Sequence, residues 1–302
     1  MRVTNQTIAT QVADELQRAY QRVARTQEAV TSGRRINRLS DDPIGAARAL
    51  GLVSAERALD QYEKNLNTAM PLFDQADSVL DDVVDRLSRA KELAVAMAND
   101  SNSPEQRAQT AMEIRELFDQ VLGLANTKVE GRFIFAGFVN GAPPFALAGG
   151  SVAYNGDSGE IFVQTSDASS IALNVPGDQI FQGAGVAGGV DIFDVYLDLA
   201  AALQNNDVNG ADGVRAQIGR LDRAMDQVLR FRAELGARTN RAQAAKDAID
   251  VLKIQYRQRR SQIEDADALT VYSDFARYQY ALQAALQSAA RLLQPSLLDF
   301  LR

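Results

Sequence analysis

The sequence contains no cysteine, no histidine and no tryptophan. Without histidine there is no Ser-His triad, no Cys-His pair and no His-ligated zinc or haem. Without cysteine there is no disulfide framework, no thiolate metal cluster and no thiol nucleophile. These absences remove the commonest catalytic and metal-binding constellations. Any chemistry would have to use carboxylates, lysine, arginine, tyrosine, serine or threonine. We expect that the protein is not an enzyme and that it holds no cofactor and no metal.

Long hydrophobic runs are also missing. No stretch approaches the ~18–20 apolar residues of a membrane-spanning helix, and residues 1–7 lack the apolar core of a secretory signal peptide. We expect no membrane insertion and no cleaved signal peptide. The net charge of −7 argues against nucleic acid as the main partner. The 302 residues are 46% hydrophobic, which suffices for two or three domains with real cores.

What the sequence does contain is hydrophobic periodicity. Apolar residues alternate at spacings of three and four from Leu52 to Met97, which predicts one long helix with a coiled-coil-like seam. Pro71 falls inside it and predicts a bend or a break. A second seam repeats at strict seven-residue intervals from Val214 to Ile263. Ser103, Pro104 and Gln106 form a capping box at the start of a third helix.

The two long segments differ in charge. Residues 51–98 carry a net charge of −4, whereas residues 215–260 carry +7. The basic segment could be a nucleic-acid-binding helix, or it could lie against the acidic helix within one bundle. Aromatic residues do not interleave with its basic residues at a regular spacing, which favours the bundle.

The middle of the chain is rich in glycine and β-forming residues. Residues 132–135, 151–154, 160–165 and 170–175 are strand candidates, and residues 155–159 (Asn-Gly-Asp-Ser-Gly) are a candidate hairpin turn. These features predict a small β-rich insert between two helical halves.

Both ends carry amphipathic helices. The seam at the start comprises Val12, Leu16, Ala19, Val23, Thr26 and Val30, and that at the end Val271, Phe275, Tyr278, Leu282, Ala285, Ala289 and Leu292, broadened by Leu286 and Leu293. Ordering the backbone of ~35 residues costs about 1–2 kcal/mol per residue. Burial of one such seam stabilises the helix by less than this cost. We hypothesise that both ends are loosely ordered in the monomer and become ordered against neighbouring subunits.

Three motifs favour ordinary structural roles. The Gly-rich segment 183–188 has the letters of a dinucleotide-binding fingerprint, but no second strand follows its helix, so it is interpreted as a flexible connection. The acidic cluster Asp77, Asp81, Asp82 and Asp85 lacks calcium-loop spacing. The carboxylates Asp157, Glu160 and Asp167 could suggest a glycosidase pair, but they lie among turn residues.

Residues 32–43 read Ser-Gly-Arg-Arg-Ile-Asn-Arg-Leu-Ser-Asp-Asp-Pro. Gly33 is a natural helix terminator, and Asp42-Pro43 is an N-cap followed by proline at the first helical position. Caps do not explain the several arginines facing two aspartates. This segment is either a polar elbow or a charged contact between subunits.

This loop resembles the signature of bacterial flagellins, Ser-Gly-x-Arg-Ile-Asn followed by Asp-Asp-Pro and a nearby glycine. Residues 261–267, Ser-Gln-Ile-Glu-Asp-Ala-Asp, resemble a second flagellin motif near the other end. The resemblance covers about residues 1–140 and 230–302. Residues 130–137 (Glu-Gly-Arg-Phe-Ile-Phe-Ala-Gly), Pro143-Pro144-Phe145 and residues 296–301 resemble the members of this superfamily that join hook to filament.

The resemblance implies a structural subunit of the bacterial flagellum that joins hook to filament by self-assembly through terminal helices. It implies a secreted protein, exported unfolded through the flagellar type III export apparatus with an export chaperone. Its partners would be copies of itself, the hook-side junction protein and flagellin. Two alternatives stay open: a flagellin that forms the filament itself, and an intracellular coiled-coil adaptor.

We therefore predict a mainly α fold, a long coiled-coil-like bundle built from both chain halves, with a small β-rich insert and amphipathic terminal helices. The expected parts are an N-terminal assembly helix and loop (1–42), two bundle halves (43–130 and 191–267), the insert (131–190) and a C-terminal assembly helix (268–302). The predicted assembly interface comprises Val12, Leu16, Val23, Val30, Arg34, Arg35, Asn37, Asp41, Asp42, Phe275, Tyr278, Leu282, Leu286, Leu293, Leu297, Leu298 and Phe300.

Overall fold

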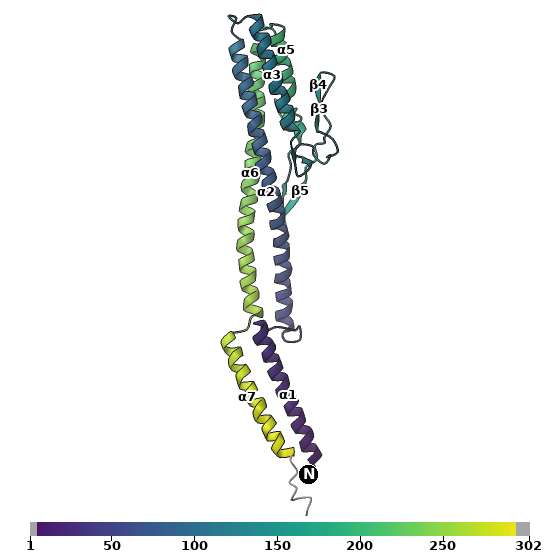
Figure 1. The fold of residues 1–302 in the computed structure, drawn as a ribbon, viewed down its shortest axis with the longest axis vertical. Helices are drawn as coiled ribbons and strands as arrows, with labels where there is room; N and C mark the ends of the chain where they lie inside the picture. The colour runs from purple at the N-terminus through teal and green to yellow at the C-terminus, as the bar shows by residue number, and fades with distance from the viewer. Residues whose placement is uncertain (1–4, 294–302) are drawn as a thin grey trace, which may run out of the picture. The chain divides into compact units, whose positions relative to one another are not determined.

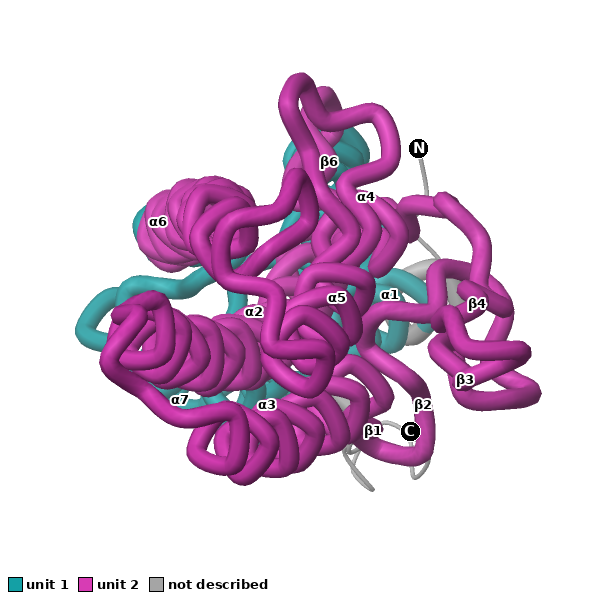
Figure 2. Tube along the Cα trace, turned by 90° about the horizontal axis from the view of Figure 1, so that it is seen from above, with its two compact units in different colours: residues 1–58, 251–302 teal, residues 59–250 magenta. Residues whose placement is uncertain are grey.

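The computed structural model describes residues 5–293, and the side chains of residues 10–291. Its helices are α1 (Asn5–Ser32), α2 (Pro43–Met97), α3 (Pro104–Ala125), α4 (Gly177–Phe181), α5 (Ile192–Gln204), α6 (Val214–Glu264) and α7 (Ala268–Leu293) (Figure 1). The chain divides into two compact units (Figure 2). Unit 1 comprises residues 1–58 and 251–302, and unit 2 comprises residues 59–250.

Unit 2 is a helical bundle with a continuous apolar core. The predicted heptad seam of α6 is buried from Val214 to Ile249, with every seventh residue at most 3% exposed. The buried seam of α2, the apolar face of α3 and most of α5 belong to the same core. Ser103 caps α3, and Gln106 completes the predicted capping box. The mainly α fold with long packed helices is thus confirmed.

Helix α2 runs through Pro71 without interruption, so the expected break is absent. Pro71 is exposed, whereas Ala69 and Phe73 on either side are at most 1% exposed. Packing of these two side chains holds both halves of the helix in place. Tertiary packing therefore compensates for the backbone hydrogen bond that proline cannot donate.

The acidic and basic helices lie side by side in unit 2, as the bundle interpretation predicted. Arg232 of α6 pairs with Asp77 at 2.9 Å and with Asp81 at 2.5 Å, both on α2. Lys91 of α2 pairs with Asp222 of α6. The acidic cluster is thus partly a set of partners for a basic helix. In the described part of the chain, no three or more aspartate or glutamate residues are grouped so that they could hold a metal ion.

The insert consists of three two-stranded antiparallel hairpins. They pair β1 (Lys128–Val129) with β2 (Arg132–Phe133), β3 (Phe145–Ala148) with β4 (Ser151–Tyr154), and β5 (Phe162–Ser166) with β6 (Ser169–Ala172). All four predicted strands are present, β4 with the predicted bounds and the other three with shifted ends, whereas β1 and β3 were missed. The two-residue turn between β3 and β4 is Gly149-Gly150, both at positive φ.

The predicted hairpin turn at residues 155–159 is wrong, because this segment connects two different hairpins. The Asp157 carboxylate accepts hydrogen bonds from the backbone N–H groups of Phe138 and Gly159, both at 2.8 Å. The hydroxyl of Tyr154 donates to the Phe135 carbonyl, at 2.9 Å. Long-range contacts therefore decide the path of this segment.

Buried Arg238 of α6 fastens the insert to the bundle. Its guanidinium donates to the Asn174 carbonyl at 2.9 Å and pairs with Glu160 and Glu234, at 3.2 and 2.6 Å. Glu160 therefore helps to attach the insert to α6. Asp167 accepts a hydrogen bond from the hydroxyl of Tyr62, at 2.6 Å. Both carboxylates therefore have structural partners.

Candidate assembly interface

Unit 1 contains the paired terminal helices α1 and α7, which pack against each other along their seams. Every seam position that the sequence predicted on α1 is half-buried, from Val12 to Val30. On α7 the seam from Val271 to Ala285 is half-buried, and Ala289 is buried. Each helix thus covers one side of the other and leaves the rest of its surface uncovered.

Helix α7 also carries a second apolar stripe, formed by Leu269, Tyr272 and Tyr280. These side chains are 84%, 60% and 73% exposed. Leu286, which the sequence analysis placed at the edge of the seam, is 51% exposed. The spacings between these residues, three and then eight, place them on one face of the helix and could have revealed the second stripe. The more regular spacing of the main seam drew the prediction to the other face. The side chain of Leu293 and the residues Leu297, Leu298 and Phe300 lie outside the described residues.

The loop between α1 and α2 is shaped by its caps. Gly33, at φ +70°, ends α1, and its N–H donates to the Ala29 carbonyl. The Asp42 carboxylate accepts from the Gly45 N–H at 2.9 Å and so caps α2, as predicted. This backbone bond, together with the neighbouring Arg35, lowers the pKa of Asp42. A Cβ at Gly45 would lie 2.5 Å from Asp42 Oδ2, so the nearby glycine is sterically required.

The second motif, residues 261–267, forms the connection between α6 and α7. The Asp267 carboxylate accepts from the Thr270 hydroxyl at 2.8 Å and from the Leu269 N–H at 3.1 Å. These two bonds cap α7 and lower the pKa of Asp267, the hydroxyl having the larger effect. In each motif an aspartate therefore caps the helix that follows.

The two motifs meet in the folded chain. Arg34 and Asp265 form an antiparallel β-bridge. The Arg35 N–H donates to the Glu264 carbonyl at 2.6 Å, and the Ala266 N–H donates to the Gly33 carbonyl at 2.9 Å. The backbone therefore joins the segment that follows α1 to the segment that connects α6 with α7. We call residues 33–42 and 261–267 the motif joint.

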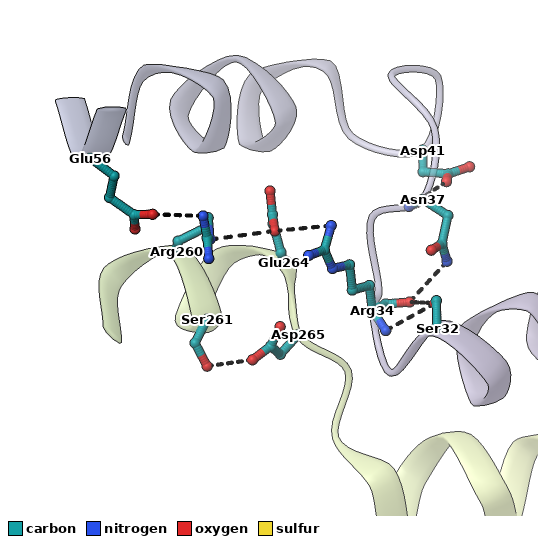
Figure 3. Close-up of polar contacts among 9 residues, drawn as sticks. All are labelled: Ser32, Arg34, Asn37, Asp41, Glu56, Arg260, Ser261, Glu264 and Asp265. Atoms are coloured by element: carbon teal, nitrogen blue, oxygen red, sulfur yellow. Dashed lines mark hydrogen bonds and ion pairs between the residues drawn. The ribbon is translucent and has the colours of Figure 1, made fainter. Parts of the chain in front are cut away.

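Ion pairs surround the motif joint (Figure 3). Arg260 pairs with Glu56 at 2.9 Å and lies 3.9 Å from Glu264, which in turn contacts Arg34 at 3.6 Å. The Ser261 hydroxyl donates to Asp265 at 2.5 Å. Arg34 is largely exposed, so its pair stabilises the joint by at most about 1 kcal/mol. The backbone bonds contribute more to its geometry.

Each charged or polar residue predicted in this loop has a partner within the chain. The Arg35 guanidinium donates to Asp42 at 3.4 Å and to the Ile263 carbonyl at 2.9 Å. Asp41 accepts from the N–H of Asn37, and the Asn37 side chain donates to the Arg34 carbonyl. These contacts support the polar elbow. A contact of the same residues with another subunit stays a prediction.

The structure also bears on the Gly-rich segment 183–188 and on the prediction about the membrane. The helix α4, not a strand, precedes the Gly-rich segment 183–188, so the dinucleotide fingerprint lacks its structural context. No helix in the described part of the chain is long and apolar enough to cross a bilayer.

Comparison with known proteins places the chain. The bacterial flagellin N-terminal helical region matches residues 3–140, and the C-terminal helical region matches residues 218–301. Flagellar hook-associated protein 3 of Escherichia coli is 29% identical over 278 residues, 86% of this chain and 87% of that protein.

Solved structures agree on the fold. A flagellar hook-associated protein from Vibrio parahaemolyticus superimposes with a TM-score of 0.68 at 22% identity, over 74% of this chain and all of that one. The flagellar junction protein FlgL of Legionella pneumophila gives 0.60 at 17% identity, over 72% of this chain and all of that one. The two helical regions, the capping motifs and these relatives agree: the chain belongs to the bacterial flagellin family.

Proposed function

We propose that this chain is a structural subunit of the bacterial flagellum that joins the hook to the filament. The observation that carries the proposal is the incompletely covered α1–α7 pair, in a chain whose relatives include hook-associated protein 3 and a flagellar junction protein. A self-assembling subunit needs apolar surface that its own fold leaves open.

Assembly proceeds through the terminal helices. Their mutual seam is only half-buried, and α7 presents further apolar side chains outward. Neighbouring copies supply the missing cover, with Val12, Leu16, Val23 and Val30 on α1 and Phe275, Tyr278, Leu282 and Leu286 on α7. The subunit carries out no catalysis.

The partners follow from this position. They are copies of the same chain, the hook-side junction protein and flagellin. The chain is exported through the flagellar type III export apparatus, with an export chaperone. Immunoelectron microscopy of whole cells tests the position. A short band at the hook–filament boundary is expected; label along the whole filament would identify a flagellin, and purely cytoplasmic label an adaptor.

A matched pair of variants tests the role of α7. Leu286→Asp places a charge on the outward side of the terminal pair, where burial by a neighbouring copy would be costly. Leu147→Asp makes the same change at 55% exposure in the insert. We expect only the first to block incorporation into flagella, with unit 2 folded in both, as circular dichroism would report. Normal incorporation of Leu286→Asp would contradict assembly through this face.

A further inference from the structure

The Gly-rich connection between α4 and α5 forms one wall of a small surface cleft in unit 2, and α6 forms the other. The residues that line it are Val186, Ala187, Gly188, Gly189, Arg223, Asp226, Gln227 and Arg230. This is the segment whose sequence has the letters of a phosphate-binding loop. The family role proposed above does not use it.

The loop wall is a closed turn that requires glycine. Gly183 has φ +68°, and a Cβ at this position would lie 2.7 Å from the backbone nitrogen of Val190. The Val186 N–H donates to the Gly183 carbonyl at 3.1 Å, and the Gly189 N–H donates to the Val186 carbonyl at 2.9 Å. The segment is therefore a shaped turn, not the flexible connection that the sequence suggested.

The buried side chain of Gln227 fixes this turn to α6. Its amide oxygen accepts from the Val190 N–H at 3.0 Å. Its amide nitrogen donates to the carbonyls of Ile180 and Val190, at 2.7 and 3.1 Å. Gln227 is 1% exposed, so these bonds are shielded from water. The two walls of the cleft are consequently held in one arrangement before any ligand arrives.

Several donors in the cleft have no acceptor. Arg223 and Arg230 are two helical turns apart, about 10.5 Å along the axis, and both are exposed. Neither forms a hydrogen bond or ion pair with any described residue, and the backbone N–H groups of Ala187 and Gly188 donate to none. Asp226 pairs with neither arginine. With two arginines and one aspartate, the lining carries a formal charge of +1.

We propose that this cleft binds an oxyanion, a phosphate or carboxylate group, between the two guanidinium groups and the glycine turn. Guanidinium groups and backbone N–H groups are the donors that such anions prefer in proteins. The anion comes either from solution or from an acidic side chain of a neighbouring copy, since each copy carries a net charge of −7. The proposal does not rest on the junction function.

Titration of the isotopically labelled full chain with inorganic phosphate tests the site. We expect the amide signals of Ala187 and Gly188 to shift saturably, whereas sodium chloride at matched ionic strength leaves them in place. The variant Arg223→Gln/Arg230→Gln should weaken the apparent affinity by about tenfold or more. The control Arg241→Gln removes an exposed arginine of α6 that lies outside the cleft and pairs with no described residue, and it should not change the affinity.

Incorporation of the same variants into flagella distinguishes the two sources. If Arg223→Gln/Arg230→Gln loses phosphate binding and also incorporation, the anion is a carboxylate of a neighbouring copy. If it loses phosphate binding but incorporates normally, the anion is free in solution. Absence of a saturable shift in the unmodified chain, or an equal shift in the double variant, would overturn the proposal.

Discussion

Both units are built from helices with regularly spaced apolar side chains, but the two units bury these side chains to different degrees. In unit 2 the seams of α2 and α6 close over a core that includes α3 and α5. Among the described residues of unit 1, the only buried apolar side chains are Ile36, Ala46, Ala49 and Ala289. The same helix, α6, changes character along its length, since its seam is buried at Ile249 and only half-buried at Tyr256 and Ile263.

The comparison teaches that hydrophobic periodicity predicts a helix but does not show which residues bury its apolar face. In unit 2 that face is buried by other helices of the same chain. In unit 1 two helices bury each other on one side only, which supports the proposal that neighbouring copies cover the rest. Four experiments test how far this difference extends.

Hydrogen exchange should show the largest difference. Amides of α1 and α7 in the monomer are expected to exchange at least about three orders of magnitude faster than those of α2 between residues 73 and 94, because local opening of a partly covered helix costs far less than global unfolding. Mass spectrometry of pulse-labelled, verified monomer measures this. Equal protection of the two regions would show that the terminal helices are complete without neighbours.

A pair of phenylalanine truncations should differ by several kcal/mol. Phe193 is fully buried and contacts Phe118, Phe145 and Phe181. Phe193→Ala should lower the free energy of unfolding of unit 2 by about 3–5 kcal/mol. Phe275→Ala, in half-buried α7, should leave that transition unchanged and cost at most about 1 kcal/mol in unit 1. Urea denaturation of both variants provides the comparison, which fails if the two costs are alike.

A pair of arginine substitutions should give a smaller contrast. Arg238→Ala removes a buried guanidinium and leaves the Asn174 carbonyl and two carboxylates without their donor, at a cost of about 2 kcal/mol. Arg38→Ala in unit 1 removes an exposed pair with Glu28, at a cost of about 0.5 kcal/mol or less. Thermal unfolding measures both. A large effect at Arg38 would mean that the loop is stiffer than its exposure indicates.

The smallest expected difference between the two units is in how their stability depends on pH. The folded-state pKa values of Asp42 and Asp267 are lowered, so their stabilisation is present at neutral pH and is lost as the pH falls through those values, below about 3.8. Burial raises the pKa of Asp191 in unit 2, so its contribution has the opposite sign and is greatest at low pH. Hydrogen exchange at pH values from about 5 to 3 should show the motif joint loosening first. In Asp42→Asn/Asp267→Asn that dependence should flatten.

The sequence predicted most of what local rules determine. The heptad seam of α6, the capping box at Ser103 and the caps at Gly33 and Asp42 are present as expected. The errors arose where contacts between residues distant in the sequence determine the local conformation. Asn155-Gly156 has the letters of a tight turn, yet the Asn155 N–H donates to the Pro144 carbonyl and Asp157 bonds to Phe138. Pro71 was expected to bend or break α2, but the helix is continuous there, and the packing of Phe73 and its neighbours overrides the local preference.

The site was predictable only in part. Caps and charges identified the first motif, and the family resemblance identified the second, but nothing in either sequence shows that Arg34 and Asp265 pair through the backbone. The five-part division of the chain stays a prediction, as do the contacts of the loop residues with other subunits. The outward stripe of Leu269, Tyr272 and Tyr280 is visible in the sequence only when the covered side of α7 is already known.

The motif joint also has a consequence for the order of folding. The Arg35 side chain and the Ile263 carbonyl that it contacts are 228 positions apart in the sequence. Contacts of such long range form slowly, because the intervening chain must first be brought into a loop. Unit 1 therefore cannot close until nearly the whole chain is present. A polypeptide that travels end-first through a narrow conduit would keep its terminal segments unpaired until it has emerged on the far side.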